Sequence, residues 1–244
     1  MKATLDYILH LADNALILGQ RNAEWCGHGP VLEQDIAISN ISLDLIGQAR
    51  TLYQYAAERQ GNGATEDSLA FLRDERQFRN CLLVELPKGD WATTTLRQFI
   101  FSTYQQLLFQ QLLSHSDERL ASIAEKTLKE IKYHVRWSSE WVIRLGDGTA
   151  ESHRRMTQAV DKIWPYSAEL FEESPLEKES GVNVTDLQPI WNEKIQTCFT
   201  EAGLTIPANV FMQHGGKKGV HSEHLGFILA EMQHLQRSYP GCEW

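Results

Sequence analysis

The stretch LDLIGQAR, residues 43–50, lies inside a long segment whose apolar residues recur with helical spacing. The apolar face of residues 31–60 comprises Ile41, Leu45, Ala49, Leu52 and Ala56. Asp44 falls on this face, and Gly47 follows at the position where a metal-binding helix would carry a histidine. The stretch therefore predicts a bundle helix, and it raises the question of whether the interior of that bundle holds a metal.

Helical spacing also dominates the rest of the chain. Further helices are predicted over residues 4–22, 91–115, 118–146, 152–172, 186–202 and 222–238, with a short helix inside the connection 61–90. Asp90 is the expected N-cap of the third long helix, and Gly146 and Gly148 are expected stop signals for the fourth. No clean strand period is found. The pattern predicts an all-α, ferritin-like four-helix bundle with a long crossover and additional C-terminal helices, forming one domain over residues 1–244.

Composition narrows the class of protein. The 244 residues carry a formal net charge of -9, which argues against a nucleic-acid binder because such a protein needs a basic face. No segment is apolar for long enough to cross a bilayer. The four cysteines (Cys26, Cys81, Cys198, Cys242) are scattered, a pattern typical of reduced thiols, and we expect a cytoplasmic protein.

The candidate metal site can be tested by counting ligands. Ferritin-like di-iron bundles use one Glu from each of two helices and a Glu-x-x-His pair from each of the other two. The positions that correspond here are Asp13, Asp44, Gly47, Thr103, Glu130, Tyr133 and His134. Residues 91–116 contain no Asp or Glu, so at most three carboxylates and one histidine remain. The set is incomplete, and we predict no metal in this chain.

The remaining acids have a second interpretation. Gln48, Tyr133 and His134 would satisfy Asp44 and Glu130 as a polar network in the core, since an isolated buried charge is costly. Gly47 would then serve the close approach of another backbone segment.

Four stretches carry a family resemblance. They are EWCGHGPVLEQDIAISNISLDLIGQAR (24–50), LAFLRDERQFRNCLLVE (69–85), KEIKYHVRW (129–137) and GGKKGVHSEHLGFILAEMQHLQ (215–236). In order and spacing they resemble the C subunits of bacterial phenylacetyl-CoA epoxidases over essentially the whole chain. The resemblance implies a ferritin-like, non-catalytic relative that pairs with a catalytic A subunit, which carries the di-iron centre. It also implies a complex that epoxidises phenylacetyl-CoA with dioxygen and electrons from a separate reductase subunit, in phenylacetate degradation.

Two other segments attract attention. Lys217 and Lys218 lie in a glycine-rich turn that lacks the spacing of a Walker motif, so they are candidates for an anion or partner contact, and the turn is expected to dock the last helix. Ser222 is a candidate cap of that helix, and the spacing of His221, Glu223 and His224 is poor for a metal. LRDERQFRN, residues 72–80, is typical of a solvated helix or a polar interface.

Three hypotheses follow. The leading one is a structural subunit without iron that binds a catalytic homologue. The alternative is a metal-dependent oxygenase in its own right, with an altered ligand set of Asp13, Asp44, Glu130 and His134. The third and weakest is a stand-alone ligand-binding bundle.

Overall fold

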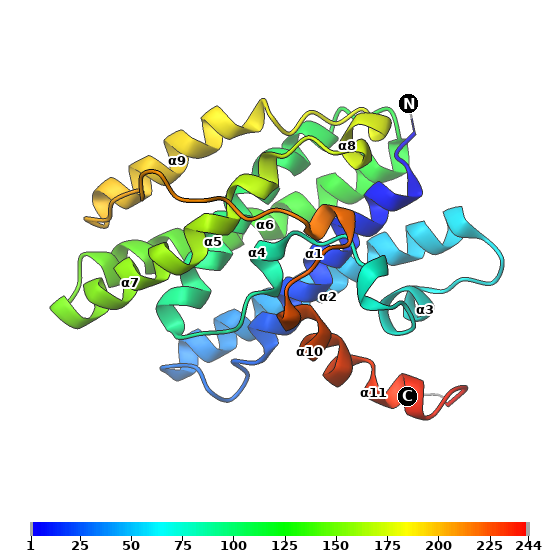
Figure 1. The fold of residues 1–244 in the computed structure, drawn as a ribbon, viewed down its shortest axis with the longest axis horizontal. Helices are drawn as coiled ribbons and strands as arrows, with labels where there is room; N and C mark the ends of the chain where they lie inside the picture. Colours follow the sequence, from blue (N-terminus) through cyan, green and yellow to red (C-terminus); the bar gives the residue numbers. More distant parts are fainter. Residues whose placement is uncertain (1, 243–244) are drawn as a thin grey trace. The chain divides into compact units, whose positions relative to one another are not determined.

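The computed structural model describes residues 2–242, and the chain within this range is helical with no strand. It divides into two compact units (Figure 1). Among the described residues, one unit comprises residues 3–87 and 215–242, and the other comprises residue 2 and residues 88–214. The all-α class predicted from the sequence is confirmed, while the single domain over residues 1–244 stays a prediction. No helix within residues 2–242 is both long enough and apolar enough to span a membrane.

The unit that contains the N-terminal helices is built on a long antiparallel pair. Its helices are α1 (Leu5–Ala23), α2 (Leu32–Gln60), α3 (Glu66–Phe71), α4 (Leu82–Glu85), α10 (Glu223–Met232) and α11 (His234–Ser238), with 3-10 turns at η1 (Glu75–Gln77) and η4 (Gly216–Lys218). α1 packs along α2, and the connection from α3 to α4 packs on this pair (Figure 1). Thr4 caps α1 by accepting from the backbone N–H of Tyr7 at 3.2 Å.

The loop between α1 and α2 is closed by one carboxylate. Asp35 accepts hydrogen bonds from the backbone N–H groups of Gly27, at 3.1 Å, and Gly29, at 2.8 Å. These bonds, with Gly29 the larger contributor, lower the pKa of Asp35 below its ordinary value. A Cβ on Gly29 would lie 2.7 Å from the Cα of Asp35, so the turn requires glycine there.

The other unit is built around a helix that is buried on nearly all sides. Its elements are α5 (Trp91–Leu112), α6 (Glu118–Gly146), α7 (Ala150–Ile163), α8 (Pro175–Ser180) and α9 (Leu187–Glu201), with 3-10 turns at η2 (Trp164–Tyr166) and η3 (Ala168–Phe171). Asp90 caps α5, as predicted, by accepting from Thr93 N–H at 2.9 Å. Eighteen of the 22 residues of α5 are buried. It is therefore a central helix rather than the amphipathic one expected.

Aromatic side chains fill the space around α5. Trp191 of α9 donates its indole N–H to the carbonyl of Ile100 at 3.1 Å, and its ring lies 5.8 Å from that of Trp164. Trp91 meets Trp137 and Trp141 edge-on at 5.8 and 5.9 Å. These tryptophans pack against one another in two groups beside α5.

Several predicted boundaries were wrong. The helix expected over residues 152–172 ends at Ile163, because Pro165 cannot continue it and two 3-10 turns follow. The helix expected over 222–238 breaks at Gln233 into α10 and α11. Within residues 72–80 only Glu75–Gln77 form a 3-10 turn, so the solvated helix expected there is wrong, while the polar interface stays a prediction. Ser222 occupies the N-cap position of α10 but makes no capping bond with its side chain.

The glycine-rich turn docks by close backbone approach. A Cβ on Gly216 would overlap the carbonyl oxygen of Asn80, and one on Gly219 would lie 2.5 Å from that of Arg76. Gly219 also has φ +75°, which disfavours a side chain. The turn thus holds the C-terminal helices against the segment around η1 and α4, in agreement with the docking role predicted for it.

Two glycine substitutions should have opposite effects on stability. The new Cβ of Gly216→Ala would push the turn away from the backbone of Asn80, so we expect the substitution to lower the free energy of unfolding by about 1–3 kcal/mol. Gly47→Ala lies in mid-helix with nothing within 4 Å of the new Cβ, so we expect a gain of about 0.5–1 kcal/mol. Urea unfolding measures both. Equal effects of the two substitutions would contradict the close packing of the turn.

Candidate functional site

Asp13 is the first of the predicted ligand positions, and its carboxylate is wholly buried. Its Oδ1 accepts from the hydroxyl of Tyr53 at 2.6 Å and from the guanidinium of Arg73. Its Oδ2 accepts from a second Arg73 nitrogen at 3.1 Å and from the backbone N–H of Arg79 at 2.7 Å. A carboxylate has about four acceptor sites, so these four bonds leave none for a metal.

Arg73 and Tyr53 are buried together with Asp13. Burial alone would lower the pKa of Arg73, but the Asp13 carboxylate and Tyr53 outweigh it and the pKa is raised. The pKa of Tyr53 is raised well above its usual value, first by burial and then by the negative charge of Asp13. The Arg73 guanidinium also lies 4.2 Å from the centroid of the Phe78 ring. The cluster is therefore a buried ion pair within one unit.

The other two predicted positions of this unit do not join that cluster. Asp44 is half-buried on α2, and Gly47 is exposed. Among the described residues, no atom lies within 4 Å of a Cβ built on Gly47, so the close approach of another backbone expected at Gly47 is not seen here and stays a prediction. On α2 the residue hydrogen-bonded to Asp13 is Tyr53. Asp44 lies nine residues, or two and a half helical turns, before Tyr53, so it is too far along the helix to join the same cluster.

The remaining predicted positions lie in the other unit. Thr103 is buried, and its hydroxyl donates to the carbonyl of Phe99 at 2.8 Å. Thr103 lines a cavity of about 450 Å³ with residues of α6 and α9, among them Ser139 and Cys198. Burial raises the pKa of the Cys198 thiol to about 12, so this thiol is unreactive at neutral pH.

The three predicted ligand positions on α6 differ in their exposure to solvent. His134 is buried and Glu130 is half-buried, while Tyr133 is 37% exposed. The Tyr133 ring meets the imidazole of His134 edge-on at 6.3 Å and carries the Arg136 guanidinium 5.7 Å from its centroid. Tyr133 therefore lies at the surface, and the core network predicted to include it is wrong on this point.

The residues do not fit a di-iron centre. Asp13 is saturated by donors, Gly47 has no side chain, and Tyr133 points outward. α5 brings hydroxyls rather than carboxylates, and these bond to the helix's own carbonyls, as Ser102 does to Gln98 at 2.6 Å. Within either unit, among the residues described, no three His, Cys, Asp or Glu side chains are grouped to hold a metal ion.

A second buried charge cluster joins the C-terminal segment to α4. Glu85 is wholly buried and accepts from His221 Nδ1 at 2.8 Å, Asn80 Nδ2 at 2.8 Å and the backbone N–H of Ser222 at 2.7 Å. His221 Nε2 lies 3.0 Å from the carbonyl of Phe78. Carboxylate and carbonyl oxygens only accept, so both ring nitrogens donate when the imidazole is protonated.

The electrostatics of His221 agree with this geometry. Burial lowers its pKa, but the hydrogen bond and the charge of Glu85 and the Phe78 carbonyl act in the opposite direction and leave it raised. Since both ring nitrogens have partners, His221 is also unavailable as a metal ligand.

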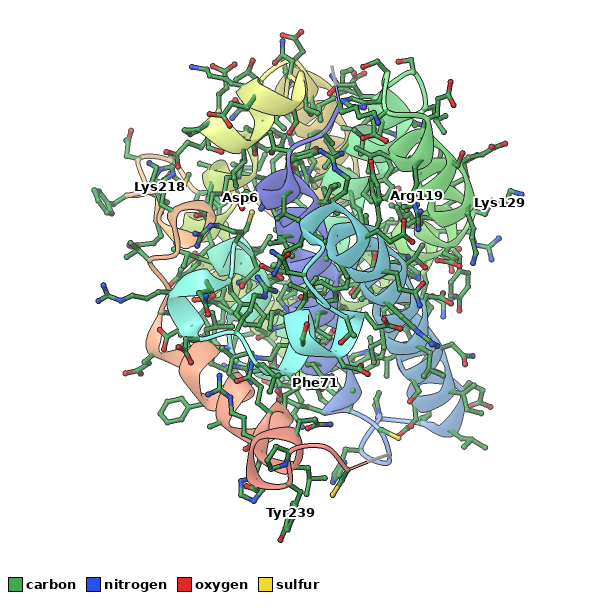
Figure 2. The ribbon with its side chains drawn as sticks, turned by 90° about the vertical axis from the view of Figure 1, so that its right-hand side faces the viewer. Asp6, Phe71, Arg119, Lys129, Lys218 and Tyr239 are labelled. Atoms are coloured by element: carbon green, nitrogen blue, oxygen red, sulfur yellow. The ribbon has the colours of Figure 1, made fainter. Side chains whose placement is uncertain are left out.

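Of the two lysines in the turn, only one is presented at the surface. Lys217 is 3% exposed, so the predicted anion or partner contact is wrong for this residue. Lys218 is exposed and points away from the ribbon (Figure 2), and its contact stays a prediction.

Sequence reasoning missed Arg73, Tyr53, Glu85 and His221 as members of buried clusters. Asp13 gave a signal, since a charge among the apolar residues of α1 demands a partner. The partner itself, Arg73, is 60 residues away in a segment whose charge density suggested solvent exposure.

Comparison with known proteins identifies the family. The chain matches the model of the phenylacetic acid catabolic protein family over residues 1–244, and it belongs to this family. It is similar to the C subunit of the 1,2-phenylacetyl-CoA epoxidase of Escherichia coli (strain K12). The two are 48% identical over 243 residues, which cover 98% of each chain. The resemblance drawn from the sequence is thereby confirmed.

Removing the charge of Asp13 should strongly destabilise the folded protein. Asp13→Asn leaves a buried guanidinium without its counter-charge, and we expect it to lower the free energy of unfolding by about 3–5 kcal/mol. In Asp13→Asn/Arg73→Met both charges are absent, so the double variant should lose less than the sum of the two single variants. Urea unfolding of all four proteins gives the coupling energy. Additive single losses, or a loss below about 1 kcal/mol for Asp13→Asn, would contradict the ion pair.

The His221–Glu85 pair should make stability depend on pH. Because the pKa of His221 is raised on folding, its contribution is fully present below the ordinary pKa of 6.5 and is lost as pH rises through the folded value. We expect the difference in unfolding free energy between the wild type and His221→Gln to be largest near pH 6 and to shrink towards pH 9. A difference that grows with pH would reverse the assigned sign.

Proposed function

We propose that this chain is a non-catalytic structural subunit of a phenylacetyl-CoA epoxidase complex. In this proposal it pairs with the catalytic A subunit in the cytoplasm and stabilises it. The A subunit holds the di-iron centre, a separate reductase subunit supplies electrons, and this chain carries no cofactor. The name of the Escherichia coli relative supports the proposal, because a protein named as one subunit of an epoxidase is part of a larger enzyme.

The saturated carboxylate of Asp13 is the observation that carries the proposal. Iron ligation would require Asp13 to release donors from Arg73, Tyr53 and the Arg79 backbone, leaving a buried guanidinium uncompensated. The absence of any carboxylate from α5 acts in the same direction, since carboxylates balance the charge of two irons.

The alternative function is a metal-dependent oxygenase with ligands Asp13, Asp44, Glu130 and His134. Glu130 is the ligand position best suited to a test of this alternative. It is half-buried on α6, so truncating its side chain should have little effect on folding. The two functions therefore give opposite expectations for this residue.

Co-expression with the catalytic subunit tests the proposal. We expect the two chains to co-purify, and iron analysis of the separated chains to find stoichiometric iron in the partner and only background in this chain. Glu130→Ala should leave turnover of the complex within about twofold of wild type, because the residue binds nothing that reacts. Stoichiometric iron in this chain, or loss of turnover in Glu130→Ala with iron lost from this chain, would favour the alternative.

A further inference from the structure

Three exposed apolar side chains lie on one side of α2, the helix drawn in light blue in Figure 1. Leu32, Ile36 and Leu43 are 72%, 51% and 65% exposed. At about 100° per residue the three fall within an arc of about 40° and extend about 17 Å along the helix. The buried residues Ile38, Ile41 and Leu45 lie on the other side. We call Leu32, Ile36, Leu43 and Gly47 the α2 stripe.

Gly47 continues the row, at about 60° from Leu32 around the helix axis. It is exposed in mid-helix, and open space surrounds the position that its Cβ would occupy. A helical glycine is unfavourable unless a backbone must come close, and no segment within residues 2–242 does so. The vacant space above Gly47 therefore suits a backbone supplied by another chain.

Charge restricts what can bind the α2 stripe. Between Arg21 and Arg50 the chain has no lysine or arginine. Glu33 and Asp44 border the stripe on one side and Asp35 borders it on the other. A complementary surface is an apolar helix face bordered by lysine and arginine, because opposite charges steer association and set the register.

The same charges disfavour a second copy of this chain on the stripe. In a two-fold dimer the same patch faces itself, which would set one acidic border against another.

We propose that the α2 stripe is the surface on which a helix of the catalytic partner subunit docks, with its apolar face bordered by basic side chains and its backbone closest at Gly47. This inference rests on the proposed function for the identity of the partner. The stripe residues are spaced by four, seven and four positions, and spacings of four and seven place side chains on one face of a helix, as in helix-mediated recognition.

The test measures the dissociation constant of this chain and the catalytic subunit. Leu43→Glu places a charge at the centre of the stripe, so we expect affinity to fall about 30-fold or more. Phe227→Glu is the matched control, since Phe227 is also 65% exposed and lies on α10 of the same unit. Its affinity should stay within about threefold of wild type. Glu33→Lys should weaken binding at low salt and reduce the salt dependence.

Gly47→Gln provides a second variant that does not endanger folding. Its side chain enters open space and glutamine is a better helix former than glycine, so the isolated chain should keep its helicity and show a urea midpoint no lower than wild type, while binding weakens at least tenfold. Far-UV circular dichroism of every variant checks that a loss of binding is not a loss of fold.

The outcomes separate the two proposals. If the wild-type chain does not bind the catalytic subunit, the proposed function fails. If the wild type binds and both Leu43→Glu and Gly47→Gln bind equally well, the proposed function stands and the α2 stripe is not the docking surface. Equal weakening by Phe227→Glu, or an effect of Leu43→Glu on self-association alone, would also overturn the assignment.

Discussion

The buried ion pair of Asp13 and Arg73 is the interaction on which one whole unit of this protein depends. Through it α1 is tied to α2, by way of Tyr53, and to the connection that follows α3, by way of Arg73 and the Arg79 backbone. That connection leads to α4, where Glu85 receives His221 from the C-terminal segment. Each of these buried charges has its donors in place, as a low-dielectric interior requires, so the unit is held together from Asp13 outward.

The same pair is the physical basis of the proposal that this chain holds no metal. The charge of a carboxylate inside a bundle can be balanced by an iron ion or by a guanidinium group. In this chain the guanidinium of Arg73 binds the carboxylate of Asp13. α5 contributes no carboxylate, and its buried hydroxyls donate to backbone carbonyls of the same helix, so they need no cation as a partner. Acids that remain on the surface, such as Glu33, are then free to act in recognition instead.

Much of the fold could be predicted from helical spacing, but the clusters could not. The long helices were found within a few residues because their burial repeats every turn, and Asp90 was identified because capping is local. The pairing of Asp13 with Arg73 joins residues 60 apart, and no local pattern announces it. Charge density was misleading for Arg73, which is buried in a segment whose composition suggested a solvated helix. Gly47 stands out in the sequence as a glycine in mid-helix, but the described residues place no backbone against it, so its role stays a prediction.

Anaerobic titration of the isolated chain with Fe(II), followed by calorimetry, tests the central claim most directly. With Asp13 held by Arg73, no saturable binding should occur, and Tyr53 should keep the ultraviolet absorption of a buried, protonated phenol throughout. Saturable uptake of a pair of irons with a change in that absorption would show that the carboxylate can leave its arginine, and it would contradict this account.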